Sequence, residues 1–197
     1  MTASATYHDL TCVILAGGQS SRMGSDKGLL TIENTSFSKQ LINLAKTLTP
    51  NVMVSVGKHN EEMYQNIGVV TVLDKVADKG PMGGIVSVLP YIKTNWFLVI
   101  SVDTPLVTSE MITDLWENKT NFDSVVYSTD NRIHPLVGLY HISTKNKWQM
   151  ALEQNELKVT KMVNSFAINI VYPSPEVAQK LKNINTPKEY QECINQA

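Results

Sequence analysis

The chain has 197 residues, of which 43% are hydrophobic and 18% are charged, and its formal net charge is −1. This length suits one ordinary domain with a sizeable core, and the composition excludes a disordered chain. A net charge near zero gives no broad positive field for nucleic acid or an anionic membrane, and without a signal-like start or a run of about 20 apolar residues we expect a cytoplasmic protein.

Short apolar runs rich in β-branched residues alternate with helix-length segments along the chain. The runs are nearly continuous, which is typical of strands covered on both faces of a parallel sheet. Alternating strands and helices predict right-handed βαβ units, and hence an α/β fold: a three-layer α/β/α sandwich with a Rossmann-like, mostly parallel sheet. The predicted strands are 11–16, 51–56, 69–73, 95–102 and 123–127, and the predicted helices between them are 36–49, 84–92 and 109–117.

The C-terminal third is less regular, and we expect a mixed sheet there. Residues 134–142 and 166–172 are predicted strands, and 143–154 is a predicted helix. A last helix is well marked, because Thr186, Pro187 and Glu189 fit an N-cap, a first-turn proline and a capping-box acid. We expect residues 1–197 to form a single domain.

A glycine-rich segment, LAGGQSSRMGSDKGLL (15–30), directly follows the first predicted strand. Ligands of open parallel sheets bind beyond the carboxyl ends of strands, so this segment lies where a ligand is expected. Gly17 and Gly18 allow backbone N–H groups to approach phosphate closely, and Arg22 and Lys27 add positive charge. The alternative is a glycine turn with surface charges. A GxGxxG loop is excluded by spacing, and a Walker A loop is excluded because Gly28 follows Lys27.

Asp103 ends the fourth predicted strand in VISVDTPLV, at the same edge of the sheet as the glycine-rich segment. A carboxylate after so apolar a run is costly unless a cation or hydrogen bonds compensate it. Magnesium fits, because it takes one or two protein carboxylates and completes its coordination with phosphate oxygens and water. The alternative is an aspartate that caps the turn before Pro105.

Asp74 closes the third predicted strand in VVTVLDK, again at the carboxyl edge. A carboxylate there can accept hydrogen bonds from N1–H and the amino group of guanine, which cytosine and uracil cannot reproduce. From the local sequence alone, a solvated turn residue is equally consistent. The glycines of GPMGG (80–84) would permit a close approach of backbone to ligand at the start of the next helix.

The segment LAGG followed by SSRMGSDKG resembles the signature of nucleotidyltransferases that transfer a nucleoside monophosphate from a triphosphate, most closely the molybdenum cofactor guanylyltransferases. The resemblance implies that about 11–105 binds the nucleotide GTP, that Arg22 and Lys27 stabilise charge during transfer, and that Asp103 in DTP binds Mg2+. It also favours the nucleotide-binding interpretation of Asp74, while Ser55 stands where some members have asparagine. The nucleotide-binding residues it implies are Leu15, Ala16, Gly17, Gly18, Lys27, Asp74 and Asp103.

The resemblance extends to the second half of the chain, where about 106–197 would bind the acceptor. Arg132 and His134 lie in an HP segment like that of the family, and NINTP (183–187) is similar to the family's C-terminal end. The implied acceptor is molybdopterin, with other proteins of the molybdenum cofactor pathway as possible partners. We interpret His59 and His141 as packed or surface residues. Alternatives are a CTP-dependent or sugar- or polyol-phosphate nucleotidyltransferase, and a non-catalytic nucleotide-binding module.

Overall fold

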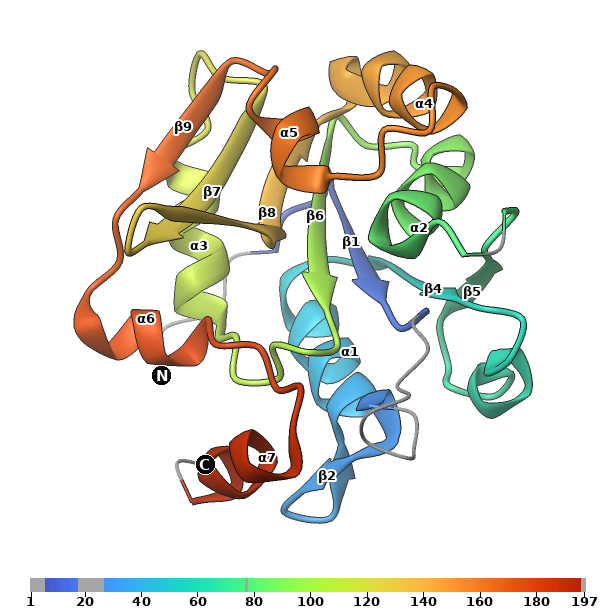
Figure 1. Ribbon diagram of the computed structural model, residues 1–197, viewed down its shortest axis with the longest axis vertical. Helices are drawn as coiled ribbons and strands as arrows, with labels where there is room; N and C mark the ends of the chain where they lie inside the picture. Colours follow the sequence, from blue (N-terminus) through green and yellow to red (C-terminus); the bar gives the residue numbers. More distant parts are fainter. Residues whose placement is uncertain (1–5, 18–26, 77, 196–197) are drawn as a thin grey trace.

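A seven-stranded sheet forms the middle layer of the protein (Figure 1). The computed structural model describes residues 6–17, 27–76 and 78–195. The strand order is β5-β4-β1-β6-β8-β7-β9, and β8 is antiparallel to both of its neighbours while every other neighbouring pair is parallel. The strands are β1 (Leu10–Leu15), β4 (Asn51–Val56), β5 (Val70–Leu73), β6 (Trp96–Ser101), β7 (Ser124–Thr129), β8 (Arg132–His141) and β9 (Ile168–Val171). The predicted α/β fold with a mixed C-terminal part is confirmed.

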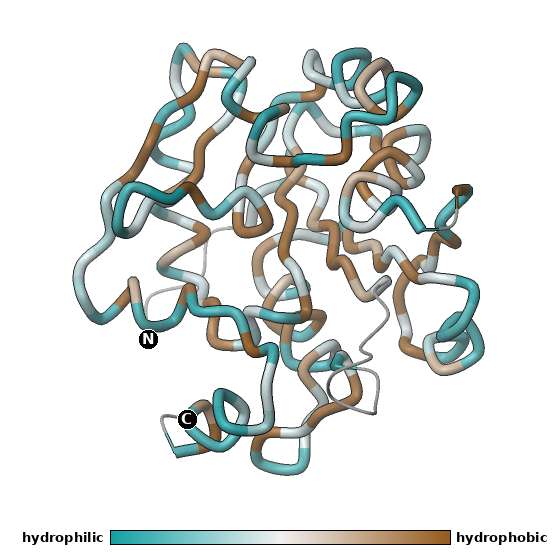
Figure 2. The backbone as a smooth tube through the Cα atoms, viewed as in Figure 1, coloured by the Kyte–Doolittle hydropathy of each residue, from teal (hydrophilic) through white to brown (hydrophobic). Residues whose placement is uncertain are grey.

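Helices cover both faces of the sheet and bury two separate cores. On one face, α1 (Phe37–Leu48) and α3 (Ser109–Glu117) pack against the sheet. On the other, α2 (Gly80–Val88), α4 (Lys145–Glu153) and α5 (Val159–Val163) do so. Figure 2 shows the strands in hydrophobic colours at the centre and hydrophilic residues on the outer turns of the helices. The burial of a nearly continuous apolar sheet between two helical layers explains why the strand sequences do not alternate.

The C-terminal helices and a small hairpin lie at the carboxyl edge of the parallel strands (Figure 1). The hairpin consists of β2 (Thr31–Ile32) and β3 (Thr35–Ser36), and the helices are α6 (Pro175–Lys180) and α7 (Pro187–Ile194). The capping box predicted for α7 is present, with Thr186 and Glu189 bonding reciprocally. A third small core, formed by Ile32, Phe37, Ile184 and Cys193, joins α7 to the hairpin. The β2–β3 hairpin and the C-terminal segment therefore meet at this edge.

The strand register brings four positions to the same level of the sheet. Leu15 pairs with Ser101 on one side and with Ser55 on the other, and Ser55 pairs with Val72. The residues two places further along these four strands are Gly17, Asp103, Gly57 and Asp74. Two carboxylates and two glycines thus form a row just beyond the carboxyl ends of β6, β1, β4 and β5. In the part of the chain that the structure describes, no helix has the length and apolarity to cross a membrane.

Candidate active site

A cleft of about 700 Å3 lies beyond β1, β4 and β5. Gly17 and Gly57 form part of its wall, and Asp74 contributes its carboxylate. A Cβ on Gly17 would lie 2.8 Å from Asp74 Oδ2 and 3.1 Å from the Gly57 nitrogen, so the carboxylate is packed directly against the backbone of the first loop. The side chain at Gly17 must be absent for Asp74 to occupy this position. The cleft is rimmed by Lys58, His59, Leu73, Lys75, Asp78, Lys79 and Gly80.

The Asp74 carboxylate is held by Ser55, which donates a hydrogen bond from its hydroxyl to Oδ1. Burial raises the pKa of Asp74 above its ordinary value, and the Ser55 hydrogen bond and the charge of His59 oppose that rise. Ionised Asp74 is therefore destabilised by its surroundings and retains capacity to accept hydrogen bonds. This is the kind of acceptor that a ligand N–H group can satisfy.

Asp103 and Lys27 form a second polar group on the other side of β1. Lys27 Nζ lies 3.7 Å from Asp103 Oδ2 and donates a hydrogen bond of 2.6 Å to Asn185 Oδ1. The Ser101 hydroxyl donates to Asp103 Oδ1 at 2.9 Å. The side chains of Lys27 and Asp103 are 15% and 26% exposed, so a fixed cation and a fixed anion face a site that solvent still reaches. Among the described residues, the Asp103 carboxylate thus bonds to Ser101 and Lys27 and makes no hydrogen bond that caps the turn before Pro105.

The end of β1 and the residues directly after it, Leu15, Ala16 and Gly17, lie between the two polar groups. Asp103 and Asp74 are separated by three strand spacings, about 14 Å in all, with Gly17 between them in the row. The Ala16 N–H donates to the Ser55 carbonyl at 2.8 Å, and the Ala16 carbonyl accepts a 2.8 Å hydrogen bond from Asn60 Nδ2. The Leu15 carbonyl accepts from the Val102 N–H at 3.1 Å. Leu15 and Ala16 are buried and fix the start of the loop against both neighbouring strands.

Residues 12–165 match the model of the MobA-like NTP transferase domain family. The chain belongs to this family. It is 30% identical over 183 residues to the molybdenum cofactor guanylyltransferase of Yersinia pseudotuberculosis serotype O:1b (strain IP 31758), covering 92% of this chain and 93% of that protein.

Solved structures share the architecture of this MobA-like chain. A protein from Aquifex aeolicus VF5 superposes with a TM-score of 0.77 at 25% identity, covering 93% of this chain and 97% of that one. Molybdopterin-guanine dinucleotide biosynthesis protein A from Archaeoglobus fulgidus superposes with a TM-score of 0.76 at 20% identity, covering 94% and 97%. At 20% identity, the similarity to the Archaeoglobus fulgidus protein shows a shared fold and no more.

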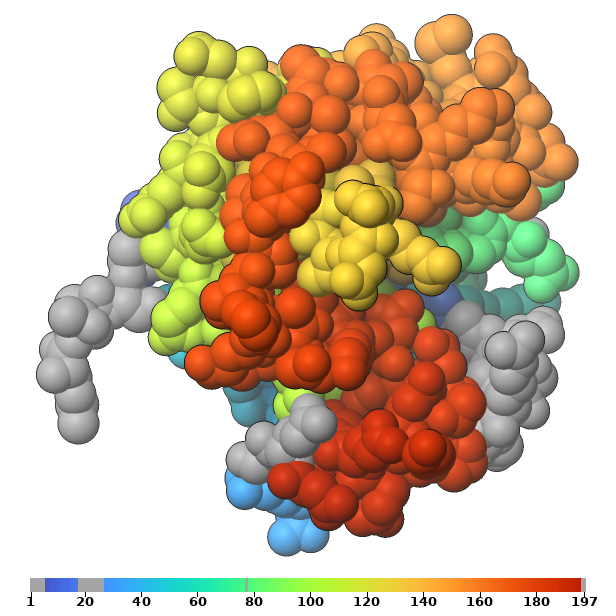
Figure 3. All heavy atoms as spheres, turned by 60° about the vertical axis from the view of Figure 1, so that its left-hand side comes forward, coloured from blue at the N-terminus to red at the C-terminus, as the bar shows by residue number. Residues whose placement is uncertain are grey.

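The two residues predicted to contact the acceptor lie near the turn between β7 and β8. His134 Nε2 and Thr129 Oγ1 are 2.5 Å apart across the hairpin, and burial lowers the pKa of His134. Arg132 is exposed at the start of β8. In Figure 3 this turn appears in yellow between the orange α4–α5 segment and the red C-terminal segment. Because β7 is parallel to β9 and antiparallel to β8, which is itself antiparallel to β6, the turn lies at the same edge of the sheet as Asp103.

Two predicted site residues, Gly18 and Arg22, lie outside the residues that the structure describes. Their roles therefore stay predictions from the resemblance. For the other predicted positions, the structure brings Lys27 and Asp103 together, and it places Gly17 beside Asp74.

Four contacts at the site could not be predicted from the linear sequence. Asn185 reaches Lys27 from 158 positions away, and the Ile184 N–H donates to the Asp103 carbonyl at 2.8 Å. His59, which we interpreted as a packed or surface residue, is exposed and lines the Asp74 cleft. Ser55 is fully buried and bonds to Asp74. Each of these contacts depends on tertiary structure that a linear pattern does not contain.

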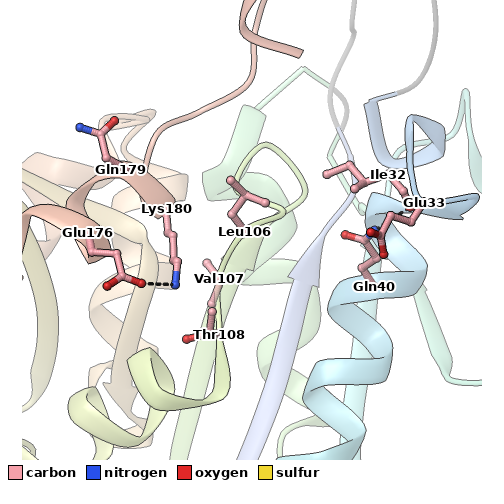
Figure 4. A pocket seen from close by; sticks show the side chains of 9 residues that line it. All are labelled: Ile32, Glu33, Gln40, Leu106, Val107, Thr108, Glu176, Gln179 and Lys180. Atoms are coloured by element: carbon pink, nitrogen blue, oxygen red, sulfur yellow. Dashed lines mark hydrogen bonds and ion pairs between the residues drawn. The ribbon is translucent and has the colours of Figure 1, made fainter. Parts of the chain in front are cut away.

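A second cavity of about 620 Å3 lies between the β2–β3 hairpin and α6 (Figure 4). Ile32, Leu106 and Val107 line its apolar part, while Gln40 and Gln179 contribute amides. Lys180 and Glu176 pair with each other along α6 at 3.0 Å, which neutralises the charge on that wall. This cavity has neither Lys27 nor the row carboxylates in its lining, so it is distinct from the candidate active site.

Replacing Asp74 with asparagine is expected to stabilise the protein at neutral pH. The folded state raises the pKa of Asp74, so its contribution to stability is present at low pH, where it is protonated, and is lost as the pH rises through the folded pKa. Asparagine stays neutral and can still accept the Ser55 hydrogen bond. Thermal unfolding of both proteins from pH 4 to pH 8 should show a gap in Tm that widens with pH. The matched control is Asp78→Asn, which removes an equal charge from the exposed rim, and a gap of the same size there would contradict the explanation.

Proposed function

We propose that this chain transfers GMP from GTP to the terminal phosphate of molybdopterin, releasing pyrophosphate and forming molybdopterin guanine dinucleotide. The observation that carries the proposal is the Lys27–Asp103 pair, 3.7 Å apart beside the glycine-rich loop at the carboxyl edge of the sheet. Membership of the MobA-like family and the similarity to a molybdenum cofactor guanylyltransferase support this reaction. We assign nucleotide binding to about 11–105 and acceptor binding to about 106–197.

The row of four positions suits one extended nucleotide. Asp74 would accept hydrogen bonds from the guanine edge in the cleft, and Gly17 and Gly18 would let the backbone approach the ribose and phosphates. Asp103 and Lys27, three strand spacings away, would then lie at the triphosphate. A nucleoside triphosphate carries its base and its phosphates on opposite sides of the ribose, so it can span both polar groups.

The chemistry requires positioning and charge stabilisation rather than a protein base. The acceptor phosphate is already an anion and can attack the α-phosphorus in line, with pyrophosphate leaving on the opposite side. Lys27, held by Asn185, would stabilise the charge that develops on the phosphates, and Arg22 would add to it. Bound at Asp103, Mg2+ would neutralise phosphate charge and orient the oxygens.

The fit of this site to Mg2+ rests on the donor set. Asp103 offers a partly exposed carboxylate beside Lys27, and one protein carboxylate suffices when phosphate oxygens and water complete the coordination. In the stretches that the structure describes, no group of three or more His, Cys, Asp or Glu side chains is placed to hold a metal.

Acceptor binding is assigned to the β7–β8 turn and the C-terminal segment. His134, whose pKa is lowered by burial, would be neutral and able to form hydrogen bonds near neutral pH, while Arg132 would supply a positive charge for the acceptor phosphate. We place the reaction in the cytoplasm and expect other proteins of the molybdenum cofactor pathway to deliver the acceptor or receive the product.

Pyrophosphate release measured with each of GTP, ATP, CTP and UTP tests the proposal. With molybdopterin and Mg2+ present, turnover is expected with GTP, and removal of Mg2+ by a chelator should abolish it. Sugar phosphates in place of molybdopterin should give no product. Turnover with CTP alone, or with a sugar phosphate alone, would contradict the proposed reaction.

A further inference from the structure

We propose that Ser55 is the residue that sets the selectivity of the nucleotide cleft for guanine over adenine, by positioning the Asp74 carboxylate. This inference rests on the proposed function, and it adds a residue that does not itself touch the nucleotide. Ser55 lies at the level of Leu15 and Val72 in adjacent strands, below the row that carries Asp74. Its hydroxyl donates to Asp74 Oδ1 from a fully buried position.

Both oxygens of Asp74 are fixed by what surrounds them. Ser55 holds Oδ1, while Oδ2 faces Gly17, where an added Cβ would lie 2.8 Å away. The Ser55 hydroxyl is enclosed in turn, because a Cβ on Gly84 of α2 would lie 2.8 Å from its oxygen and 3.5 Å from Asp74 Oδ1. The close approach of α2 to β4 therefore leaves room for the serine hydroxyl and little else.

The Ser55 hydrogen bond also favours the ionised form of Asp74. Burial raises the pKa of this carboxyl group, and the Ser55 hydrogen bond lowers it. An ionised Asp74 only accepts hydrogen bonds, which matches N1–H and the amino group of guanine. A protonated Asp74 donates one, and that matches the unprotonated N1 of adenine. Loss of the hydroxyl therefore weakens guanine binding and admits adenine.

Other charged groups line the same cleft and are unchanged by a substitution at Ser55. They come from the loops after β4 and β5 and are Lys58, His59, Lys75, Asp78 and Lys79. His59 acts in the same direction as Ser55 on the pKa of Asp74. A selectivity change in a Ser55 variant is consequently attributable to the lost hydrogen bond.

The test compares GTP and ATP binding and turnover in wild type and Ser55→Ala. We expect the KM and the dissociation constant for GTP to rise about tenfold in the variant, the usual effect of losing a hydrogen bond to a charged group. The kcat at saturating GTP should change by less than about twofold, because the reacting phosphates are not touched. The preference for GTP over ATP should fall by about the same factor as GTP affinity, roughly tenfold.

A double-mutant cycle separates positioning from general damage. In an Asp74→Asn background, Ser55→Ala should have a smaller effect on GTP binding, because the amide oxygen can still accept the Ser55 hydrogen bond but carries no charge for it to stabilise. An equal effect in both backgrounds would overturn the inference. So would an unchanged preference for GTP over ATP in Ser55→Ala.

Two further variants guard against a purely structural explanation. Gly84→Ala should raise the GTP dissociation constant by displacing the Ser55 hydroxyl. Alanine has a higher helix propensity than glycine, so weaker GTP binding in this variant could not be explained by a less stable α2. Ser124→Ala, at a buried strand serine whose Oγ has no hydrogen-bond partner among the residues that the structure describes, should leave both nucleotide affinities unchanged. If Gly84→Ala bound GTP and ATP as wild type does, Ser55 would not set selectivity.

Equilibrium binding keeps this test apart from the proposed reaction. Titration with GTP and with ATP needs no acceptor, so it reports on the cleft even if molybdopterin is not the substrate. A wild-type protein that binds GTP but produces no pyrophosphate with molybdopterin would defeat the proposed reaction and leave the Ser55 comparison intact. A wild-type protein that binds ATP as tightly as GTP would overturn the inference.

Discussion

Asp103→Ala is expected to lower kcat at least about a thousandfold while leaving the fold intact, because the substitution removes the carboxylate assigned to Mg2+. The fold should survive, since Lys27 keeps its 2.6 Å hydrogen bond to Asn185 and the backbone carbonyl of residue 103 still accepts from Ile184. Initial rates of pyrophosphate release across a Mg2+ titration measure the effect. Circular dichroism and Tm report on the fold.

A carboxylate at the opposite end of the sheet provides the matched control for Asp103. Asp9 accepts hydrogen bonds from the Asn95 N–H at 2.8 Å and from Asn95 Nδ2 at 3.0 Å, just before β1 and β6 begin. Asp9→Ala should reduce stability modestly and leave kcat and its Mg2+ dependence unchanged. Full activity in Asp103→Ala would place the metal elsewhere.

Lys27→Ala is expected to lower kcat by about a hundredfold to a thousandfold, with a smaller change in KM for GTP. The lysine is 15% exposed, and Asp103 and Asn185 hold its amino group in place. It would therefore need little reorganisation when charge develops on the transferring phosphate. A rise in KM at constant kcat would show instead that Lys27 binds the ground state and the transition state equally.

The control for Lys27 is a lysine that makes a comparable contact away from the site. Lys46 donates to the Gly68 carbonyl at 3.0 Å from the exposed side of α1. Lys46→Ala should match wild type in kcat and KM. If both lysine variants lost activity to the same extent, the role assigned to Lys27 would not be specific.

The sheet could be predicted well because its strands are buried on both faces. Apolar runs of this kind mark each strand directly, and the predicted ranges agree with the observed strands within one or two residues. The carboxyl-edge rule then places Gly17, Asp74 and Asp103 at one edge without any three-dimensional information. The capping box at Thr186 predicted the start of α7 for an equally local reason.

The misses have physical causes that a linear pattern does not reveal. The helix predicted for 84–92 begins four residues earlier, at Gly80, and the missing side chain of Gly84 lets it pack closely against Ser55 and Leu15. The α-helix ends at Val88 and is followed by a 3-10 turn at Leu89–Tyr91, where Pro90 has no N–H to donate to a helical hydrogen bond.

The small elements were missed for a related reason. The β2–β3 turn places Glu33 and Asn34 at positive φ without a glycine to mark it, so it lacks the usual hairpin signal. The helices α5 and α6 contain five and six residues, too few for a reliable helical periodicity. The pairing of Asn185 with Lys27 depends on the docking of the C-terminal segment, which follows from the whole fold.

The reversed direction of β8 gives the two halves of the molecule different freedom to diverge. Strands β5, β4, β1 and β6 pair in continuous parallel register, so an insertion in one of them would shift its residue in the row of glycines and carboxylates. The tight turn at Asp130 and Asn131 joins β7 to β8 and protrudes at the same edge without belonging to that register. If the proposed acceptor site lies at this turn, substitutions in the hairpin should change the acceptor that is used and leave GTP binding unchanged.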